Sequence, residues 1–421
     1  MSVSPVPDTD RAARLFEVLR EKTFDGVGVT REAYGPGEQI AHELARSHAE
    51  ELGMEAAVDA AGNLYMTLPG ADRTAKGIVL GSHLDSVPGG GNFDGAAGVF
   101  AGLAVVAGMR EAGFRPRCDI TVLAIRAEEA GAWFPISYPG SRAALGRLPA
   151  EALAVRRLDS GLTLEQHMRD LGFDPDTVRA ARGRLSARNT MAFVELHIEQ
   201  GPVLEAASVP VGIVTAIPGS RRLRAARASG AFNHSGATPR PYRRDALIAV
   251  AELAHRLDEH WAALETQGHR LTCTFCVLGT TEEAGFGKIA GEARFQLDVR
   301  SVQPASVDAM FLEMHRLVGA IEARRGVRFE LGQETTSEPS PMDAGVQREL
   351  VRAAQSLGIA HRAMPSGAGH DAAAFAQAGV PAGMLFVRNQ NGSHNPHEAM
   401  RMEDFAAGCA VLGRWATTVA G

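Results

Sequence analysis

Residues 78–95 read IVLGSHLDSVPGGGNFDG, and this stretch decides what kind of sheet the chain can form. A short apolar run ends at His83, as expected for a buried strand bounded by a turn. A glycine-rich loop follows at once and carries two aspartates, of which the second is Asp94. The glycines at 89–91 and Gly95 allow backbone with positive φ, so that Asp94 can fold back over His83. The stretch therefore predicts a strand with histidine and carboxylate side chains at its carboxyl end.

Three other predicted strands end in the same way. ITVLAIRAEE ends at Glu128 and Glu129, AFVELHIEQG carries His197, and MLFVRNQNGSH leads into a loop with His394. Open α/β sheets bind ligands outside the carboxyl ends of their strands. A lone histidine at a strand end is more often structural than ligating, and paired glutamates usually begin a solvated helix. Four strands that end alike nevertheless favour one shared site.

Counting ligands indicates two metal ions, because five protein ligands with one bridging carboxylate give each ion three protein contacts. The expected groups are His83, Asp94 and His197 for one ion, and Asp94, Glu129 and His394 for the other. Each ion then keeps an open position for water, as in catalytic sites. Zinc is the first choice, with manganese, cobalt or nickel as alternatives, because imidazole and carboxylate ligands suit all of these ions.

Two further side chains gain a role beside these ligands. Asp85 lies two residues after His83, where it can accept the other imidazole N–H and fix the tautomer. Glu128 is not neutralised by coordination, so it can take a proton from water as a general base and return it to a leaving nitrogen. A catalytically silent metal-binding scaffold is the alternative of another class, but a scaffold needs no base. His370 opens an apparent helix and either lines the site or only caps that helix.

Strands that alternate with helices predict an α/β sandwich with a largely parallel sheet. This pattern covers residues 1–214 and 331–421, the expected metal-binding catalytic domain. A long polar helical stretch is expected before the strand that carries His197. Residues 215–330 instead follow a β-α-β-β-α-β order, the signature of a ferredoxin-like α+β domain inserted into the first.

Composition narrows the class of protein further. The chain has 421 residues, of which 45% are hydrophobic and 22% charged, as in a globular protein too long for one ordinary core. The formal net charge of −6 gives no electrostatic reason to expect nucleic acid or an anionic membrane as a partner. The 4 cysteines suit a reducing compartment, and the N-terminal residues lack the pattern of a secretory signal. We therefore expect a cytoplasmic protein.

The motifs together resemble a known family. GSHLDSVPGGGNFDGAAGV, ELHIEQGPVLE, FNHSGATP, SGAGHDA and NGSHNPHEAM are similar to the N-carbamoyl-L-amino-acid hydrolase, β-ureidopropionase and allantoate amidohydrolase family, within the clan of two-metal aminoacylases and carboxypeptidases. The resemblance covers nearly the whole chain. It implies an aminopeptidase-like catalytic domain with the inserted domain as a dimerisation lid, and the same ligand set with Asp94 bridging and Glu128 as base.

The resemblance also implies roles that spacing does not reveal. Gln200 would contact substrate beside the metals, and Arg300 would grip a substrate carboxylate through its planar guanidinium. The backbone N–H groups of Gly367 and Gly369 would bind the same carboxylate. His234 would reach into the partner subunit's site and polarise the scissile carbonyl. The expected substrate is thus a small anionic N-substituted amino acid, and the expected partner is a second copy of the chain.

Three departures from the family affect the pocket and leave the ligands intact. Gly287 stands where relatives carry a substrate-binding asparagine. A shortened loop brings Arg388 and Asn389 near the metals, and an unusually aromatic loop offers Trp133 and Phe134 as an apolar wall if it faces the pocket. We therefore expect hydrolysis of N-carbamoyl-L-amino acids or a related ureido acid. An N-acyl-amino-acid amidase and an allantoate amidohydrolase are the alternatives.

Overall fold

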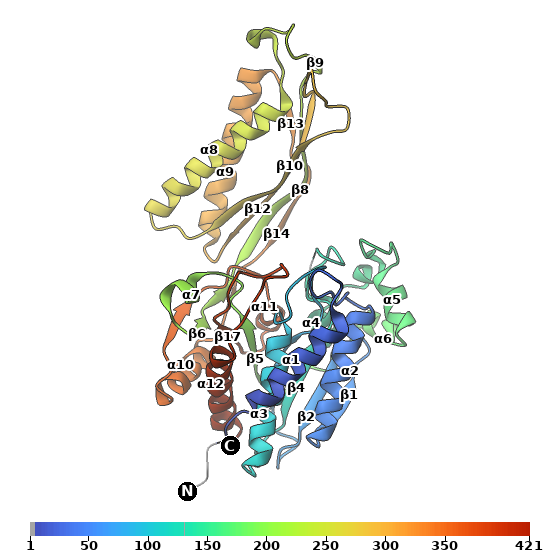
Figure 1. Ribbon diagram of the computed structural model, residues 1–421, viewed down its shortest axis with the longest axis vertical. Coiled ribbons are helices and arrows are strands. Elements are labelled where there is room, and N and C mark those ends of the chain that lie inside the picture. Colours follow the sequence, from blue (N-terminus) through green and yellow to red (C-terminus); the bar gives the residue numbers. More distant parts are fainter. Residues whose placement is uncertain (1–4, 130) are drawn as a thin grey trace. The chain divides into compact units, whose positions relative to one another are not determined.

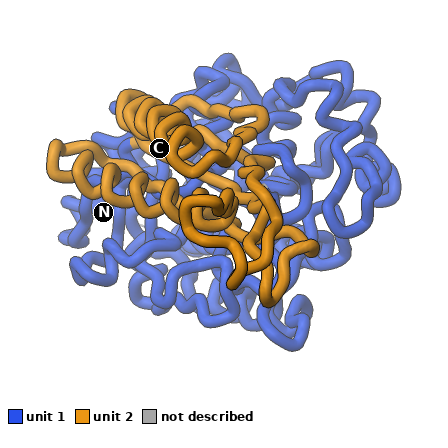
Figure 2. The backbone as a smooth tube through the Cα atoms, turned by 90° about the horizontal axis from the view of Figure 1, so that it is seen from above, with its two compact units in different colours: residues 1–215, 341–421 blue, residues 216–340 orange. Residues whose placement is uncertain are grey.

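The chain divides into two compact units. The computed structural model describes residues 5–129 and 131–421, so the first four residues of the expected catalytic domain lie outside the described residues. One unit comprises Met1–Thr215 and Pro341–Gly421, and the other comprises Ala216–Ser340 (Figure 2). The second unit is therefore an insertion in the sequence of the first. It ends at Ser340 and not at residue 330.

An eight-stranded sheet forms the centre of the first unit (Figure 1). Its strands are β1 (Glu55–Val58), β2 (Leu64–Leu68), β3 (Gly77–His83), β4 (Ile120–Ile125), β5 (Thr190–Ile198), β6 (Val211–Val214), β16 (His361–Met364) and β17 (Ala382–Val387). They lie in the order β1-β2-β4-β3-β5-β17-β6-β16. The central strands β4, β3, β5 and β17 pair in parallel, whereas β2 pairs antiparallel with β4, and β6 with β17. The sheet is thus mixed, with a parallel centre.

Helices cover both faces of this sheet. They are α1 (Thr9–Thr23), α2 (Pro36–Glu51), α3 (Ala96–Glu111), α7 (Val203–Ala207), α10 (Ala344–Ser356), α11 (Asp371–Gln377) and α12 (Met402–Ala420). Val194 and Leu196 of β5 belong to the core that α1, α2, α3, α10 and α12 share with the sheet. Phe193 points the other way and stacks on Phe375 of α11, with ring centroids 3.8 Å apart. Burial on both faces explains the uninterrupted apolar sequences of the central strands.

Glycines shape the loop between β3 and α3. Gly95 precedes α3 with a φ of +66°, and a Cβ there would lie 2.5 Å from His83 Nδ1. Of the three consecutive glycines in the loop, only Gly89 has a positive φ. A Cβ at Gly91 would instead lie 2.1 Å from the carboxyl carbon of Glu398. The glycines therefore serve close packing as well as backbone conformation, and the positive φ expected at 89–91 is wrong for Gly90 and Gly91.

The polar stretch after β4 is not one long helical segment. It forms the short helices α4 (Pro139–Ala144), η1 (Ala150–Ala154), α5 (Leu164–Asp170) and α6 (Pro175–Arg179), which surround an apolar cluster of their own. Proline occupies the first position of α4 and of α6. Gly146, Gly161 and Gly172 adopt positive φ between the helices. These residues explain the breaks, because proline favours a helix start and glycine a helix end.

The second unit is an antiparallel sheet with two long helices (Figure 1). Its elements are β7 (Ala216–Ile217), β8 (Gly219–Ser229), β9 (Asn233–His234), η2 (Arg240–Tyr242), α8 (Ala246–Thr266), β10 (Thr272–Thr280), β11 (Lys288–Ile289), β12 (Glu292–Ser301), α9 (Pro304–Arg325), β13 (Arg328–Glu330) and β14 (Glu334–Ser337). The short strand β15 (Ser340–Pro341) spans the boundary with the first unit. The sheet order is β10-β12-β8-β13, and β14 also pairs with β8. This last pairing carries the unit beyond β13. In the described part of the chain, no helix combines the length and the apolar character that crossing a bilayer requires.

The close contact between α3 and the sheet can be tested with Gly98→Ala. A Cβ at Gly98 would lie 2.3 Å from the carbonyl oxygen of Leu196, which is backbone and cannot move aside easily. We expect the variant to lose about 1–3 kcal/mol of unfolding free energy in urea. The matched control is Gly319→Ala in α9, where nothing lies within 4 Å of the added Cβ. The control should be neutral or slightly stabilising. Equal effects of the two substitutions would contradict the proposed packing.

Candidate metal centre

The carboxyl ends of β3 and β5 bring two histidines and an aspartate together. His83 ends β3 and His197 lies near the end of β5, with their Nε2 atoms 3.4 Å apart. Asp94 Oδ1 lies 3.1 Å from His197 Nε2 and 3.5 Å from His83 Nε2. All three side chains are buried, and together they form a group able to hold a metal ion.

A second group shares Asp94. His394 Nε2 lies 3.3 Å from Asp94 Oδ2 and 3.5 Å from Glu129 Oε2. Glu129 is buried, whereas the side chain of His394 is 51% exposed, so this group faces solvent on one side. The structure thus assembles the same two groups that ligand counting predicts, with Asp94 common to both.

The site fits cations because buried carboxylate oxygens lack hydrogen-bond donors. Asp94 Oδ1 and Glu129 Oε1 are buried and receive no hydrogen bond of acceptable geometry. An unpaired buried carboxylate oxygen is costly. Divalent ions held between these oxygens and the nearby imidazole nitrogens would remove that cost. The nitrogen and oxygen donor set suits first-row divalent ions.

Burial also shifts the pKa values of the carboxyl groups. Burial raises the pKa of Glu129 to about 7, and neighbouring Asp94 adds to the effect. Burial raises the pKa of Glu128 well above its usual value, with Asp371 and Glu129 adding to the effect and His83 opposing it. Burial acts in the same direction on Asp94, but the imidazoles of His197, His394 and His83, all within 3.5 Å of its carboxylate, outweigh it and hold the pKa of Asp94 well below its usual value.

Asp85 organises the loop that follows β4. Its Oδ1 accepts the N–H of Glu128 at 3.0 Å, and its Oδ2 accepts the N–H of Glu129 at 3.1 Å. Asp85 Oδ1 also lies 3.3 Å from His83 Nδ1. The hydrogen bond of His83 Nδ1 runs to the backbone oxygen of Asp85 at 3.1 Å, so the carboxylate lies beside the imidazole while it holds the N–H groups of both glutamates, which spacing does not reveal. Glu128 Oε2 lies 4.0 Å from His83 Nε2, beside the ligands without belonging to either group.

Gln200 lies among the ligands. Its Nε2 donates to Asp94 Oδ2 at 2.8 Å, and its backbone has a φ of +63°. Asn389 is buried, and its Oδ1 accepts the N–H of Gln200 at 3.0 Å. Arg388 instead donates two hydrogen bonds to the carboxylate of Asp404, at 2.9 and 2.8 Å. Of the two residues in the shortened loop, Asn389 holds the backbone of Gln200 beside the candidate ligands and Arg388 contacts α12.

The structure adds a third group that strand-end patterns miss. Glu195, His197 and His370 are buried, with possible ligand atoms close to one another. Glu195 Oε1 accepts a hydrogen bond from Ser82 Oγ at 2.7 Å, and Oε2 accepts the N–H of Ala372 at 2.8 Å, so both oxygens are engaged. The ring of His370 packs against that of His197 with centroids 4.5 Å apart and does not cap α11. The one signal in the sequence is that Glu195 shares a strand face with His197.

Two of the expected substrate-binding residues belong to the second unit. His234 is exposed, and its Nδ1 accepts the N–H groups of Gly236 and Ala237, both at 3.1 Å. These bonds leave Nε2 as the N–H donor of the neutral ring. Arg300 donates from Nε and Nη2 to Asp298 Oδ2, at 3.0 and 2.8 Å. The guanidinium of Arg300 is thus held by a neighbouring carboxylate on its own strand.

The expected glycine turn and the aromatic loop belong to the first unit. Gly367 and Gly369 precede α11, and a Cβ at Gly369 would lie 2.1 Å from Tyr138 Oη. Trp133 and Phe134 are 5% and 2% exposed and pack into the apolar cluster around α4 to α6. The apolar wall expected from these two aromatic residues is therefore wrong, because they are needed as core for the short helices.

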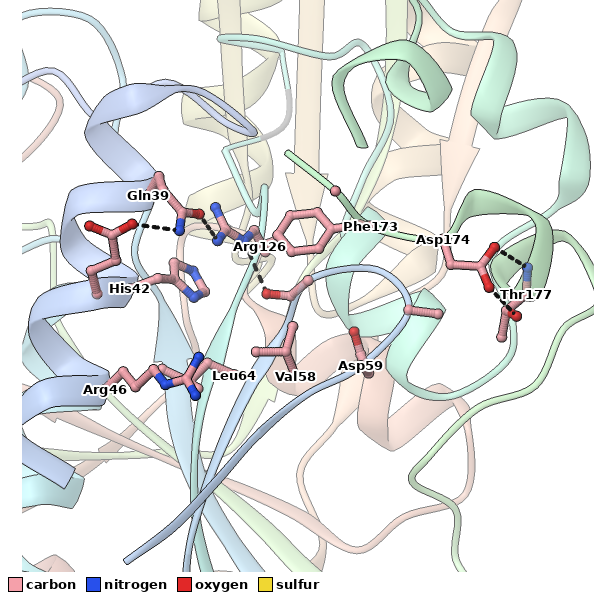
Figure 3. A pocket seen from close by; sticks show the side chains of 14 residues that line it. Gln39, His42, Arg46, Val58, Asp59, Leu64, Arg126, Phe173, Asp174 and Thr177 are labelled. Carbon is pink, nitrogen blue, oxygen red and sulfur yellow. Dashed lines mark hydrogen bonds between the residues drawn. The ribbon is translucent and has the colours of Figure 1, made fainter. Parts of the chain in front are cut away.

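A cavity of about 560 Å³ lies elsewhere in the first unit, between α2, the β1–β2 hairpin and residues 172–177 (Figure 3). Arg126 lines it and donates to Gln39 Oε1 at 2.6 Å and to the carbonyl oxygen of Gly62 at 3.0 Å. None of the predicted metal ligands is among the described residues that line this cavity. The cavity is therefore separate from the candidate metal centre.

Known proteins match this chain over most of its length. The family described as Peptidase family M20/M25/M40 matches residues 79–418. An N-carbamoyl-L-amino acid amidohydrolase of Geobacillus stearothermophilus is 38% identical over 403 residues, 95% of each chain. An allantoate amidohydrolase of Bacillus subtilis is 32% identical over 386 residues, 91% of each chain.

Solved structures agree with these relatives. A hydantoinase/carbamoylase family amidase from Burkholderia multivorans has a TM-score of 0.86 and 29% identity, and covers 99% of both chains. A hydantoinase/carbamoylase family amidase from Burkholderia ambifaria has a TM-score of 0.83 and 33% identity. The resemblance drawn from the sequence motifs is confirmed. The chain belongs to the peptidase family M20/M25/M40.

Proposed function

We propose that the protein is a metal-dependent amidohydrolase that cleaves the ureido C–N bond of N-carbamoyl-L-amino acids or of a related ureido acid. Hydrolysis would release ammonia, carbon dioxide and the free amine. The observation that carries the proposal is the pair of ligand groups that share Asp94, with Glu128 beside them and outside both. The relatives named as N-carbamoyl-L-amino acid amidohydrolases support the substrate class.

The proposed cofactor is a pair of divalent ions, zinc in the first instance, with manganese, cobalt or nickel as alternatives. The proposed ligands are His83, Asp94, Glu129, His197 and His394. Such ions lower the pKa of water and polarise a carbonyl oxygen.

Glu128 is proposed to hold and move the proton. The carboxylate takes a proton from the attacking water and returns it to the leaving nitrogen. The raised pKa of Glu128, which burial causes, makes it a stronger base than an exposed glutamate. Asp85 positions the backbone of Glu128, because its carboxylate accepts the N–H groups of Glu128 and Glu129.

The proposed substrate carries a carboxylate. Arg300 would bind that carboxylate with two parallel hydrogen bonds, with Asp298 orienting the guanidinium from behind. The backbone N–H groups of Gly367 and Gly369 would complete this subsite, and Gln200 would contact substrate beside the ligands. His234 presents Nε2–H as a donor suited to a developing oxyanion.

The second unit is proposed to be a dimerisation domain that acts as a lid. In a homodimer, His234 of one copy would complete the site of the other. The exposed position of His234 and its fixed tautomer support a role outside its own fold. The low cysteine content suits a cytoplasmic location.

An N-acyl-amino-acid amidase is the second candidate. Gly287 stands where a polar substrate contact is expected, and nothing lies within 4 Å of a Cβ placed there. This open position favours a bulkier or less polar N-substituent. The burial of Trp133 and Phe134 removes the other support for this candidate. An allantoate amidohydrolase remains the alternative within the ureido class, since one relative carries that name.

Glu128→Gln should keep the metals and lose turnover, because an amide is nearly isosteric but cannot accept the proton. We expect about two divalent ions per chain by metal analysis, and a kcat reduced by about 10²–10⁴-fold. Glu111→Gln, at the exposed end of α3, is the matched control and should behave as wild type. A near-full rate in Glu128→Gln would exclude Glu128 as the base. Fewer than one ion per wild-type chain after reconstitution would exclude the two-metal site.

Mixing His234→Ala with Glu128→Gln should restore activity if His234 acts across the dimer. Random exchange gives heterodimers with one intact site, so we expect about a quarter of wild-type activity per chain. Each variant alone, and each mixed with itself, should stay inactive. If mass spectrometry verifies subunit exchange but activity does not return, then His234 does not act in trans.

A substrate panel separates the candidate activities. The panel contains N-carbamoyl, N-formyl, N-acetyl and N-aroyl forms of the same L-amino acids, together with allantoate and β-ureidopropionate. We expect the enzyme to prefer N-carbamoyl compounds at least tenfold in kcat/KM, which corresponds to about 1.4 kcal/mol in transition-state binding. Activity confined to acyl or aroyl compounds would overturn the proposal.

Arg300→Ala should raise KM strongly, whereas Arg294→Ala, at an exposed position of the same strand, should not. An unchanged KM in Arg300→Ala would remove the carboxylate anchor.

A further inference from the structure

Glu398 is a buried carboxylate that contacts the loop carrying Asp94. It is 8% exposed, and its Oε1 accepts the N–H of Phe93 at 2.8 Å and the N–H of Asp94 at 3.2 Å. The other oxygen, Oε2, accepts a hydrogen bond from Ser393 Oγ at 2.5 Å. Glu398 thus joins two loops that are distant in the sequence, and each loop carries a proposed metal ligand.

Ser393 connects this carboxylate directly to the shared ligand. Ser393 immediately precedes His394, and its Oγ lies 2.8 Å from Asp94 Oδ2. A hydroxyl group carries one proton, so it cannot donate to Glu398 and to Asp94 at the same time. A cation on Asp94 would satisfy that carboxylate and free the Ser393 proton for Glu398. The hydroxyl therefore lies between a metal ligand and a fixed acceptor.

The residues around Glu398 are restricted by its buried carboxyl group. Only glycine fits at position 91, because a Cβ there would lie 2.1 Å from the carboxyl carbon of Glu398. Buried Arg31 supplies the facing positive charge and donates to the backbone oxygen of Asp94 at 3.1 Å. Burial raises the pKa of Glu398 to about 7, with Asp94 adding to the effect. A buried acid at this cost is expected to serve a purpose that an apolar side chain cannot.

Glu398 does not itself join a ligand group. It is absent from the three groups of described residues that could hold an ion, and both of its oxygens are engaged by donors of this chain. Its contacts run to the backbone of Asp94 and, through Ser393, to the Asp94 carboxylate. This pattern matches the outer partners of metal ligands, which fix the orientation of the ligands.

We propose that Glu398 is a positioning residue for metal binding, which holds the shared ligand Asp94 in place through its backbone N–H and through Ser393. The inference rests on the proposed metal ligands. It also connects the two halves of the site, because the same carboxylate orders the loop before α3 and the loop after β17. Loss of Glu398 would leave the ligands present but misplaced, and would weaken the metal site before any substrate binds.

The experiment measures metal affinity on the full-length protein without substrate. Metal-free wild type and variants are titrated with Zn²⁺ in competition with a chromophoric chelator, and circular dichroism checks the fold. Glu398→Ala should weaken Zn²⁺ binding by roughly 10- to 100-fold. Glu398→Gln keeps an oxygen for the two backbone N–H groups and should recover much of that loss. Glu403→Ala removes an exposed carboxylate from the same segment and should leave affinity unchanged.

Two outcomes would overturn the proposal. One is a folded Glu398→Ala protein with wild-type Zn²⁺ affinity. The other is an equal loss in Glu398→Ala and Glu403→Ala. If Glu398→Ala does not fold, Ser393→Ala decides, since it removes only the link between Glu398 and the Asp94 carboxylate: weaker binding supports the proposal and unchanged binding overturns it. Absence of Zn²⁺ binding by wild type would instead contradict the proposed metal-dependent function.

Discussion

The parallel alignment of β4, β3, β5 and β17 is the constraint on which the candidate site depends. Because these neighbouring strands run in the same direction, their carboxyl ends meet at one edge of the sheet. His83 pairs in register with Ile125, two residues before Ala127, and His197 pairs with Phe386 of β17. Backbone hydrogen bonds of the sheet therefore place His83 and His197, whereas Asp94, Glu129 and His394 lie in the loops that follow the strands. The loops then supply the remaining side chains of the candidate site.

Several residues around the candidate site have unusual backbone conformations. Ala127, Tyr138, Gln200 and His394 all have positive φ although none is glycine. Ala127 and Gln200 lie two residues beyond a strand end, and His394 is itself a proposed ligand. At these positions the chain turns sharply. Such conformations cost free energy and persist where the surroundings impose them. Buried carboxylates hold the chain near two of these residues: Asp85 accepts the N–H of Glu128, next to Ala127, and Glu398 accepts a hydrogen bond from Ser393, next to His394.

The candidate site also contains a cluster of buried acidic side chains. Carboxyl groups of Asp85, Asp94, Glu128, Glu129 and Glu398 are buried close to one another, with Arg31 as a buried cation among them. A cluster of this kind is unfavourable without further positive charge. The proposed divalent ions would supply that charge and would use the oxygens that lack donors. The same environment raises the pKa of Glu128, which the proposed mechanism needs for proton transfer.

The sequence by itself determined the α/β fold, the family and the two groups of ligand residues, because apolar runs that end in histidine or carboxylate report directly on strand ends. It did not reveal Asp85 as the acceptor for two backbone N–H groups, nor Glu195, Glu398 and Arg31 as buried partners, since these contacts join segments far apart in the chain. Local patterns also misjudged Trp133 and Phe134, whose aromatic character suited a pocket wall and a core equally well. Tertiary structure decided these cases, because burial and hydrogen-bond partners depend on which segments the fold brings into contact.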